Sequence, residues 1–191
     1  EATTRRALRA VPEFETVERI LDLGCGTGGS TLVLATETSA RVTAVDVHEP
    51  FLATLRANAT ARGVAERITT LAADMADAAA FGTDFDLVWS EGAAYSIGFE
   101  NALRTWRPLL RPSGHLVVTE LVWCIDARSD EAVAFWSAEY PDMADEPTRV
   151  DQARAIGYDV IETFRLPAED WRAYYAGVDA ALREAVARHG D

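Results

Sequence analysis

Apolar and β-branched residues cluster in several short stretches of the chain, and segments with a helical spacing of apolar residues separate them. Short apolar runs that end at polar turns are typical of strands buried in a sheet. The predicted strands cover residues 20–23, 41–46, 67–72, 85–89, 115–121 and 158–166. The predicted helices cover residues 31–35, 50–62, 101–110, 128–140 and 171–189, and a further one ends at Gly157. Strands that alternate with helices predict an α/β fold with a doubly wound, mostly parallel sheet and helices on both faces.

The first predicted strand ends in a turn that is rich in glycine. Asp22 lies at the end of the apolar run, and Gly24, Gly26, Gly28 and Gly29 follow before the next helix begins. A turn of this kind lets the backbone approach a ligand closely, and the N-terminus of the helix offers free N–H groups. The turn therefore predicts a ligand site.

Three classes of ligand use such a turn, and the spacing of the side chains separates them. The phosphate loop of nucleotide triphosphatases needs a lysine where this chain has Ser30, and the chain contains no lysine. The dinucleotide pattern G-x-G-x-x-G fits if Gly29 is its third glycine. The pattern acidic-x-G-x-G-x-G fits equally well, with Asp22 first and Gly28 last. Because a carboxylate suits an ammonium group better than a pyrophosphate, the second pattern favours a zwitterionic, cationic ligand.

On these residues the chain resembles the Rossmann-like (class I) S-adenosylmethionine (SAM)-dependent methyltransferases, whose principal cofactor motif is D-x-G-x-G-x-G. The resemblance covers about residues 16–166 and includes the stretch L-x-P-x-G at residues 110–114. Residues 90–99, together with Glu120 and Trp123, look like uncharacterised bacterial small-molecule methyltransferases of the ubiquinone-methylase-like kind. The resemblance implies the strand order 3-2-1-4-5-6 with the family's seventh strand missing or truncated. It also implies SAM as cofactor and S-adenosylhomocysteine (SAH) as product.

Further carboxylates follow the second and third strands. Asp46 comes at about the 20-residue spacing after Gly24 at which an acidic residue binds ribose hydroxyls, although a helix cap is an alternative role. Because NAD-binding and SAM-binding folds share this feature, Asp46 predicts only a nucleoside. The resemblance implies that Asp74 accepts a hydrogen bond from the adenine amino group, with a surface turn as the alternative. The expected cofactor-binding residues are Asp22, Gly24, Cys25, Gly26, Thr27, Gly28, Asp46, Val47, Asp74, Met75 and Ser90.

The end of the fourth strand is expected to face the methyl group of the cofactor, because this strand lies beside the first at the switch point. Glu91 and Glu120 are the expected catalytic residues, as general bases, although both also suit structural roles. The expected substrate-binding residues are Glu91, Tyr95, Trp123 and Trp136. In the resembled family, insertions after the fifth strand form walls of the acceptor site. We therefore expect residues 124–157 to be a helical acceptor-site insertion and residues 1–15 a partial N-terminal lid.

Composition narrows the classes of function. The formal net charge is −13, from 18 basic and 31 acidic residues, and such a surface repels nucleic acid. No apolar run has the length of a membrane span and no signal peptide precedes the first strand, so we expect a cytoplasmic single domain over residues 1–191 with no membrane partner. Cys25 and Cys124 form no metal-binding spacing, and no carboxylate–histidine group does, so no metal is expected.

The sequence thus predicts a SAM-dependent methyltransferase that transfers a methyl group to an N or O nucleophile of a small molecule. Two alternatives stay open. One is a NAD(P)-dependent oxidoreductase that uses Gly24, Gly26 and Gly29, and the other is a SAM-binding protein without turnover. The acceptor, the use of a general base and the oligomeric state, a homodimer included, are open at this point.

Overall fold

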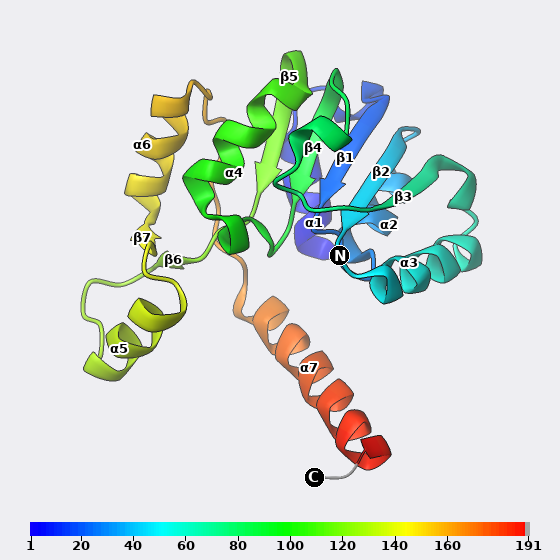
Figure 1. Ribbon diagram of the computed structural model, residues 1–191. Helices are drawn as coiled ribbons and strands as arrows, with labels where there is room; N and C mark the ends of the chain where they lie inside the picture. The colour runs from blue at the N-terminus through cyan, green and yellow to red at the C-terminus, as the bar shows by residue number, and fades with distance from the viewer. Residues whose placement is uncertain (190–191) are drawn as a thin grey trace. The chain divides into compact units, whose positions relative to one another are not determined.

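The computed structural model describes residues 1–189 of the chain, which divides into two compact units. The first unit, Glu1–Val160, is an α/β domain. The second begins at Ile161 and contains the long helix α7 (Ala168–His189). Figure 1 shows the elements of both units. The predicted alternation of strands and helices is confirmed in the first unit.

Five parallel strands form the central sheet of the first unit, in the order β3-β2-β1-β4-β5. Their bounds are β1 (Arg19–Leu23), β2 (Arg41–Asp46), β3 (Ile68–Ala72), β4 (Phe85–Ser90) and β5 (Leu110–Val118). Every residue of β4 is buried, as expected for a strand that is covered on both faces. The order confirms the 3-2-1-4-5 part of the predicted sheet, and its switch point lies between β1 and β4.

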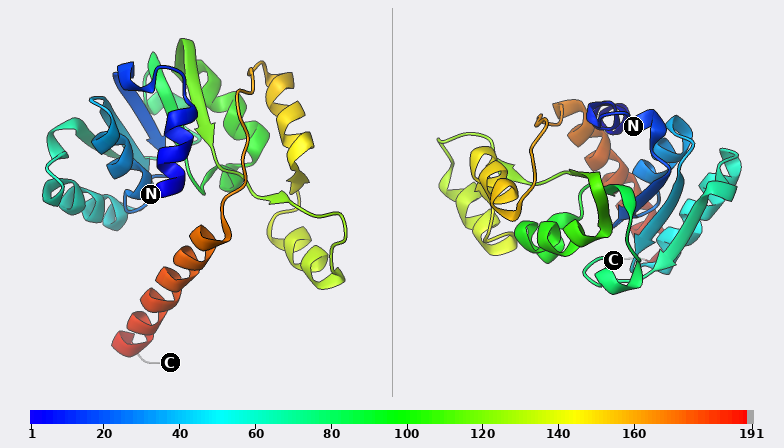
Figure 2. Two further views of the ribbon diagram at one scale, coloured as in Figure 1. Left: turned by 180° about the vertical axis from the view of Figure 1, so that it is seen from behind. Right: turned by 90° about the horizontal axis from the view of Figure 1, so that it is seen from above.

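Helices pack against both faces of this sheet. Ile20 and Trp89 belong to the apolar core on one face, whereas Leu21, Val88 and Trp106 belong to the core on the other. Successive strand residues point to opposite faces, which is why each strand feeds both cores. Figure 1 shows α4 in front of the sheet, and the view from behind in Figure 2 shows α1 in front of it. The helices of the first core are α1 (Ala2–Ala10), α2 (Gly29–Glu37) and α3 (Glu49–Ala61), and that of the second is α4 (Phe99–Trp106).

A small region after β5, which we call the insertion region (residues 122–156), is built apart from the central sheet. Its elements are β6 (Val122–Trp123), α5 (Asp130–Glu139), β7 (Ala144–Asp145) and α6 (Glu146–Ile156). β6 and β7 form a parallel pair of their own. The Ser129 side chain caps α5 by accepting from the N–H of Ala132, and Asp145 caps α6 in the same way. α6 ends at Gly157, whose φ of 97° permits the left-handed turn.

Short 3-10 helices join several of these elements. They are Phe14–Thr16, Ala65–Arg67, Ala78–Ala80, Ala94–Ile97 and Arg107–Leu109. Within α7, Arg183 donates to Asp179 at 3.0 Å, and the rings of Trp171 and Tyr175 stack with their centroids 6.0 Å apart. No helix in residues 1–189 is long and apolar enough to cross a membrane.

The prediction of a sixth strand over residues 158–166 is wrong. In the described part of the chain this stretch pairs with no strand, and the sheet ends at β5. Tyr158 and Val160 instead pack against the cluster that contains Phe99 and Leu103 of α4. The Tyr158 hydroxyl also donates to the carbonyl oxygen of Leu103 at 3.0 Å. An alternation of apolar residues marks the side that faces a core, but it does not tell whether the backbone has a ladder partner.

Candidate functional site

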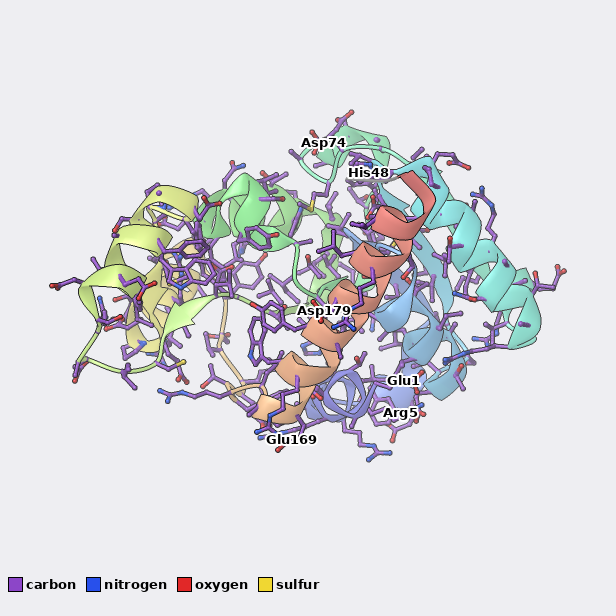
Figure 3. The ribbon with its side chains drawn as sticks, turned by 90° about the horizontal axis from the view of Figure 1, so that it is seen from below. Glu1, Arg5, His48, Asp74, Glu169 and Asp179 are labelled. Atoms are coloured by element: carbon purple, nitrogen blue, oxygen red, sulfur yellow. The ribbon has the colours of Figure 1, made fainter. Side chains whose placement is uncertain are left out.

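The carboxyl ends of β1 to β4 lie at one edge of the sheet, because these strands are parallel. This carboxyl edge holds the glycine turn and four carboxylates, namely Asp22, Asp46, Asp74 and Glu91. β2 and β3 continue to pair beyond their ends, where the N–H of Ala73 donates to the carbonyl oxygen of Asp46 at 3.2 Å. Figure 3 accordingly shows His48 and Asp74 close to one another. Ligands of open parallel sheets bind at such an edge, near the switch point.

Three glycines of the turn after β1 have left-handed backbone angles, with φ of 70° at Gly24, 54° at Gly26 and 90° at Gly28. A Cβ atom at Gly24 would overlap the side chain of Ala93, and one at Gly28 would overlap that of Leu55. A Cβ atom at Gly26 would meet no atom of the described chain within 4 Å. Packing therefore requires Gly24 and Gly28, whereas Gly26 leaves the backbone open to a ligand.

Gly29 separates the two candidate glycine motifs. In the dinucleotide pattern the third glycine allows close packing of the helix against the strand. Gly29 is the first residue of α2, and a Cβ atom there would meet no described atom within 4 Å. The close approach is made by Gly28, against Leu55 of α3. This geometry favours the spacing that begins at Asp22 and ends at Gly28 over the one that ends at Gly29.

Asp22 is a fully buried carboxylate on β1, directly before the turn. Its Oδ2 accepts from the hydroxyls of Ser30 at 2.9 Å and Thr31 at 2.6 Å. Its buried Oδ1 has no hydrogen-bond donor among the described residues. Desolvation by burial raises the pKa of Asp22 to about 7, and the hydroxyls of Thr31 and Ser30 oppose that shift. A buried carboxylate with one oxygen left over suits a ligand that brings an ammonium group.

Asp46 closes the glycine turn onto the end of β2. Its Oδ2 accepts from the N–H of Gly26 at 2.9 Å, and its Oδ1 accepts from the N–H of His48 at 2.8 Å. Each carboxylate oxygen can accept a further hydrogen bond, which is the capacity that two ribose hydroxyls require. The apolar side chain of Val47 follows directly and is 60% exposed at the same edge. Asp46 and Val47 thus offer a polar and an apolar surface side by side.

Asp74 and Met75 lie beyond the end of β3. The Asp74 side chain is exposed, and its Oδ1 accepts from the N–H of Ala76 at 2.8 Å, which makes a local turn. Met75 is half-buried, and its carbonyl oxygen accepts from the indole of Trp106 at 2.9 Å. Its sulfur lies 3.5 Å from the position of a Cβ atom on Gly24. Met75 therefore borders the glycine turn.

The remaining predicted cofactor residues differ in exposure. Thr27 is exposed at the tip of the turn, while Cys25 and Ser90 are buried. Burial raises the pKa of the Cys25 thiol, which keeps it protonated. The Ser90 hydroxyl donates to the carbonyl oxygen of Leu23 at 2.9 Å. This hydrogen bond joins the end of β4 to the end of β1.

Glu91 follows β4 and is held from two sides. Its Oε1 accepts from the indole N–H of Trp89 at 3.1 Å, and its Oε2 accepts from the hydroxyl of Thr4 at 3.3 Å. Thr4 is a buried residue of α1, so the N-terminal helix reaches the carboxyl edge. α1 is anchored by an ion pair of Arg5 with Glu37 of α2 at 2.7 Å. The predicted lid segment thus contacts a predicted catalytic residue.

The chain is similar to proteins of one enzyme family. Residues 20–114 match the model of a methyltransferase domain. The chain is 29% identical over 184 residues to the uncharacterised protein YjhP of Escherichia coli (strain K12), covering 95% of this chain and 72% of that protein. The X-ray structure of YjhP has a TM-score of 0.85 and 25% identity, and covers 100% of this chain and 78% of that one.

A second solved structure carries the product of methyl transfer. The SAM-dependent methyltransferase from Thiobacillus denitrificans, in complex with SAH, has a TM-score of 0.81 and 26% identity to this chain. The match covers 100% of this chain and 76% of that one. The chain belongs to the class I SAM-dependent methyltransferases. SAM is accordingly the cofactor of this methyltransferase and SAH its product.

The residues of the methyltransferase's carboxyl edge fit this cofactor. The Oδ1 of Asp22 is a buried acceptor that lacks a donor in the described residues, and the cofactor's ammonium group would supply one. Asp46 retains acceptor capacity for two hydroxyls, and Gly26 keeps the turn open. No cluster of three or more His, Cys, Asp or Glu residues with the geometry of a metal site occurs in residues 1–189.

The aromatic residues predicted for the acceptor differ in their surroundings. Tyr95 of the methyltransferase is 45% exposed, and its ring lies edge-on to Tyr140 with the centroids 6.2 Å apart. Trp123 is covered by the guanidinium of Arg128 at 4.6 Å. Trp136 makes an edge contact with the ring of Phe135 at 5.1 Å. Tyr95 is therefore the predicted aromatic residue that the fold leaves most open, while Trp123 already binds a cation of the chain itself.

Glu120 of the methyltransferase belongs to a buried polar cluster with Tyr140 and Arg149, which we call the Glu120 cluster. The Tyr140 hydroxyl donates to Glu120 Oε1 at 2.5 Å, and Arg149 Nη2 donates to the Tyr140 hydroxyl at 2.8 Å. Arg149 Nη2 lies 3.2 Å from Glu120 Oε1, and both side chains are 7% exposed. Burial raises the pKa of the Glu120 carboxyl, while Tyr140 and Arg149 oppose that shift. Glu120 also raises the pKa of Tyr140, although burial does so more strongly.

Tyr140 and Arg149 were not predicted from the sequence as members of this cluster. Tyr140 was expected at the end of a predicted helix whose aromatic residues either pack or contact the acceptor, and Arg149 lies on α6 among other charged residues. Arg149 also stacks on Phe99 of α4, with its guanidinium carbon 5.0 Å from the ring centroid. Since these residues lie far apart in the chain, no local spacing marks them.

Proposed function

We propose that this methyltransferase transfers the methyl group of SAM to a nitrogen or oxygen nucleophile of a small molecule. The observation that carries the proposal lies beside β4 and β5, where Tyr140 donates to Glu120 and lies edge-on to Tyr95, and where Glu91 follows the end of β4. The net charge of −13 argues against a nucleic-acid acceptor. Carboxylates and a phenol ring suit a polar molecule that carries an exchangeable proton.

The proposed cofactor contacts follow from the geometry of the turn. Asp22 holds the ammonium group, Asp46 the ribose hydroxyls, and Asp74 with Met75 the adenine. Gly26 leaves the backbone of the turn open to the ligand, and Gly24, Cys25, Thr27 and Gly28 shape the turn around it. Val47 offers an apolar surface to the adenine, and Ser90 supports the turn by holding β4 to β1. These roles account for every predicted cofactor residue.

In the proposed reaction, SAM supplies a methyl group on a positively charged sulfur, and the leaving group is the neutral thioether of SAH. The protein positions the acceptor in line with the methyl group and excludes water, effects that together are worth roughly 7–11 kcal/mol. The acceptor's nucleophile loses a proton, and a carboxylate of the protein takes it up. Glu91 and Glu120 are the proposed groups for that step, and Tyr95, Trp123 and Trp136 are the proposed acceptor contacts.

The experiment that tests this proposal follows SAH release from SAM with panels of amines, phenols and carboxylic acids. We expect turnover with a member of the amine or phenol panel, and an about 10²–10⁴-fold slower reaction for the variants Glu91→Gln or Glu120→Gln if that side chain is the base. Turnover of carboxylic acids alone would contradict the need for a base. Tight binding of SAM without release of SAH across all panels would favour a SAM-binding protein without turnover.

A further inference from the structure

Three buried side-chain atoms have no hydrogen-bond partner among the described residues. They are Asp22 Oδ1, Glu120 Oε2 and Arg149 Nε. Buried polar atoms are paired in most proteins, and an unpaired one costs free energy that a ligand or a water molecule offsets. The ammonium group of the cofactor accounts for Asp22. The other two atoms belong to the Glu120 cluster, which contains none of the proposed cofactor-binding residues.

The partners of the Glu120 carboxylate in the described part of the chain all lie at one oxygen. Its Oε1 accepts from the Tyr140 hydroxyl at 2.5 Å and lies 3.2 Å from Nη2 of Arg149, while its Oε2 has no donor there. Asp22 has the same arrangement, since two hydroxyls bond to its Oδ2 and leave Oδ1 for the cofactor. A carboxylate held in this way has a fixed direction and an oxygen free to accept from a ligand.

The guanidinium of Arg149 is held from several sides. Its Nη2 donates to the carbonyl oxygen of Asp142 at 2.8 Å, and its Nη1 donates to the side chain of Gln152 at 3.0 Å. The guanidinium carbon lies 5.0 Å from the ring centroid of Phe99 and 5.5 Å from that of Tyr140. Since these contacts fix the guanidinium, it cannot turn to find a partner for its buried Nε within the described residues.

The two unpaired atoms of the Glu120 cluster need opposite partners, and this selects the chemical group of the ligand. A hydroxyl both donates and accepts hydrogen bonds, whereas an ammonium group only donates. A hydroxyl can therefore serve both Glu120 Oε2 and Arg149 Nε, while an ammonium group can serve only the first. Charge favours the same choice, because Glu120 and Arg149 already balance one another at 3.2 Å. An ammonium group would add an unbalanced positive charge beside Arg149, and a hydroxyl adds none.

The Glu120 cluster adjoins the end of β4. The N–H of Thr119 donates to the carbonyl oxygen of Ser90, the last residue of β4, at 3.0 Å, and Glu120 is the next residue of the chain. The ring of Tyr140 lies edge-on to that of Tyr95, which is 45% exposed and follows β4 by five positions. The cluster therefore lies where the proposed function places the methyl acceptor.

We propose that the Glu120 cluster binds an uncharged hydroxyl group of the methyl acceptor, with Glu120 Oε2 accepting from it and Arg149 Nε donating to it. Tyr140 is a positioning residue, because its bond to Oε1 directs Oε2. The inference rests on the proposed function and deepens it, since it names an alcohol or a phenol as the class of molecule that the site binds. This role of Glu120 is to bind, and it requires no transfer of a proton to the carboxylate.

The first test measures binding to the full chain saturated with SAH, so that no methyl transfer occurs. The probes are two pairs with a shared skeleton, benzyl alcohol with benzylamine and 2-phenylethanol with 2-phenylethylamine, and both amines are charged at neutral pH. In NMR titrations we expect each alcohol to bind about tenfold more tightly than its amine. Glu120→Gln replaces one carboxylate oxygen by an N–H₂ group, so it should weaken the alcohols about tenfold and leave the affinity for SAH unchanged.

Glu100→Gln is the matched control, because Glu100 pairs with Arg104 on the exposed side of α4. It removes the same charge elsewhere and should leave the binding of all four probes unchanged. Turnover separates binding from base catalysis once an alcohol is found that the chain methylates. Loss of a binding group raises KM for that alcohol more than it lowers kcat, whereas loss of a base lowers kcat.

A second measurement needs no ligand. If the cluster serves binding, apolar residues of similar shape at all three positions should be tolerated by the fold. The triple variant Glu120→Met, Tyr140→Phe and Arg149→Met should therefore unfold in urea at a midpoint no lower than that of the unaltered chain, and it should bind no alcohol. A clearly lower midpoint would mean that the cluster is structural, which contradicts the inference.

An unaltered chain that binds no alcohol, or binds the amines as tightly as the alcohols, would also contradict the inference, because water alone then pairs the two buried atoms. Failure of the proposed function gives a different result. In that case the alcohols bind as expected, but no panel of methyl acceptors releases SAH from SAM.

Discussion

The turn after β1 and the insertion region are built on different principles. The turn is dictated by the backbone, because Gly24 and Gly28 admit no side chain and Asp46 binds a backbone N–H. The insertion region depends on side chains, since α5 has no buried residue and the Glu120 cluster joins residues that follow β5 and α5 to Arg149 of α6. The turn is thus held by backbone geometry, whereas the insertion region is held by a side-chain cluster.

The largest expected effect on stability comes from a substitution that breaks the Glu120 cluster. Arg149→Met leaves the Glu120 carboxylate buried without its cation, so the free energy of unfolding should fall by about 3–5 kcal/mol. Urea denaturation measures the loss, and the double variant Glu120→Gln with Arg149→Met should recover part of it. Calorimetry with SAH should show an unchanged affinity, because the cluster contributes nothing to the turn. A loss below 1 kcal/mol would mean that the pair is open to water.

The next effect tests which glycines form the motif. Gly28→Ala strains a left-handed residue and overlaps Leu55, so it should destabilise the protein by about 2–4 kcal/mol and abolish SAH binding. Gly29→Ala is the matched control, since its Cβ atom meets no described atom within 4 Å. It should leave both stability and affinity nearly unchanged. The reverse pattern would favour the dinucleotide motif.

Asp46→Ala should weaken SAH binding by about 100-fold, because it removes the acceptor of two hydroxyls and the bond that closes the turn onto β2. Asp74→Asn provides the comparison. Its side chain is exposed and bonds within its own turn, so we expect a change of less than about fivefold. Calorimetry of both variants measures these effects. Equal losses would show that adenine and ribose recognition contribute alike.

Asp22 should make the free protein less stable as pH rises. Its folded pKa of about 7 lies above the unfolded value, so its contribution to stability is full below about pH 4 and is lost as pH rises toward 7. Asp22→Asn should therefore raise the free energy of unfolding by about 2 kcal/mol near pH 8 and by much less near pH 4. The same variant should lose most SAM affinity. Urea denaturation across this pH range would contradict the account if both proteins followed the same curve.

The smallest expected effect lies on α5. Phe135 is 55% exposed and contacts Trp136, so Phe135→Ser should change the free energy of unfolding by no more than about 0.5 kcal/mol. SAH affinity should stay the same, while turnover of an acceptor should change if α5 forms an acceptor wall. Denaturation, calorimetry and SAH release report these quantities separately. A large loss of stability would show that α5 packs more tightly than its exposure indicates.

The contrast also explains what could be predicted from sequence. The predicted order of the five strands is confirmed. These strands could be predicted because buried strands show continuous apolar runs and short alternations in the sequence. SAM is also confirmed as the cofactor. It could be predicted because the spacing of the glycines reflects backbone angles that each residue adopts locally. Asp22 and Asp46 could be predicted as cofactor-binding residues because they lie at the ends of predicted strands. Such local signals survive in a single sequence.

Other features could not be predicted, because they depend on contacts between distant residues. Tyr158 and Val160 alternate like a strand but pack against α4, so residues 158–166 were assigned wrongly. The bond of Tyr140 to Glu120 and the burial of Arg149 arise only once α6 packs against the segment that follows β5. The hydrogen bond from Thr4 to Glu91 likewise joins residues that are 87 positions apart in the sequence. The spacing of residues along the chain does not predict these tertiary contacts.

A crystal structure of the complex with SAH tests the central claim most directly. The account predicts the ribose hydroxyls on the Asp46 carboxylate, the ammonium group directed toward Asp22 Oδ1, and the backbone of Gly26 against the ligand. A complex in which Asp46 points away from the sugar, or in which Gly29 rather than Gly28 lies at the closest approach, would contradict it.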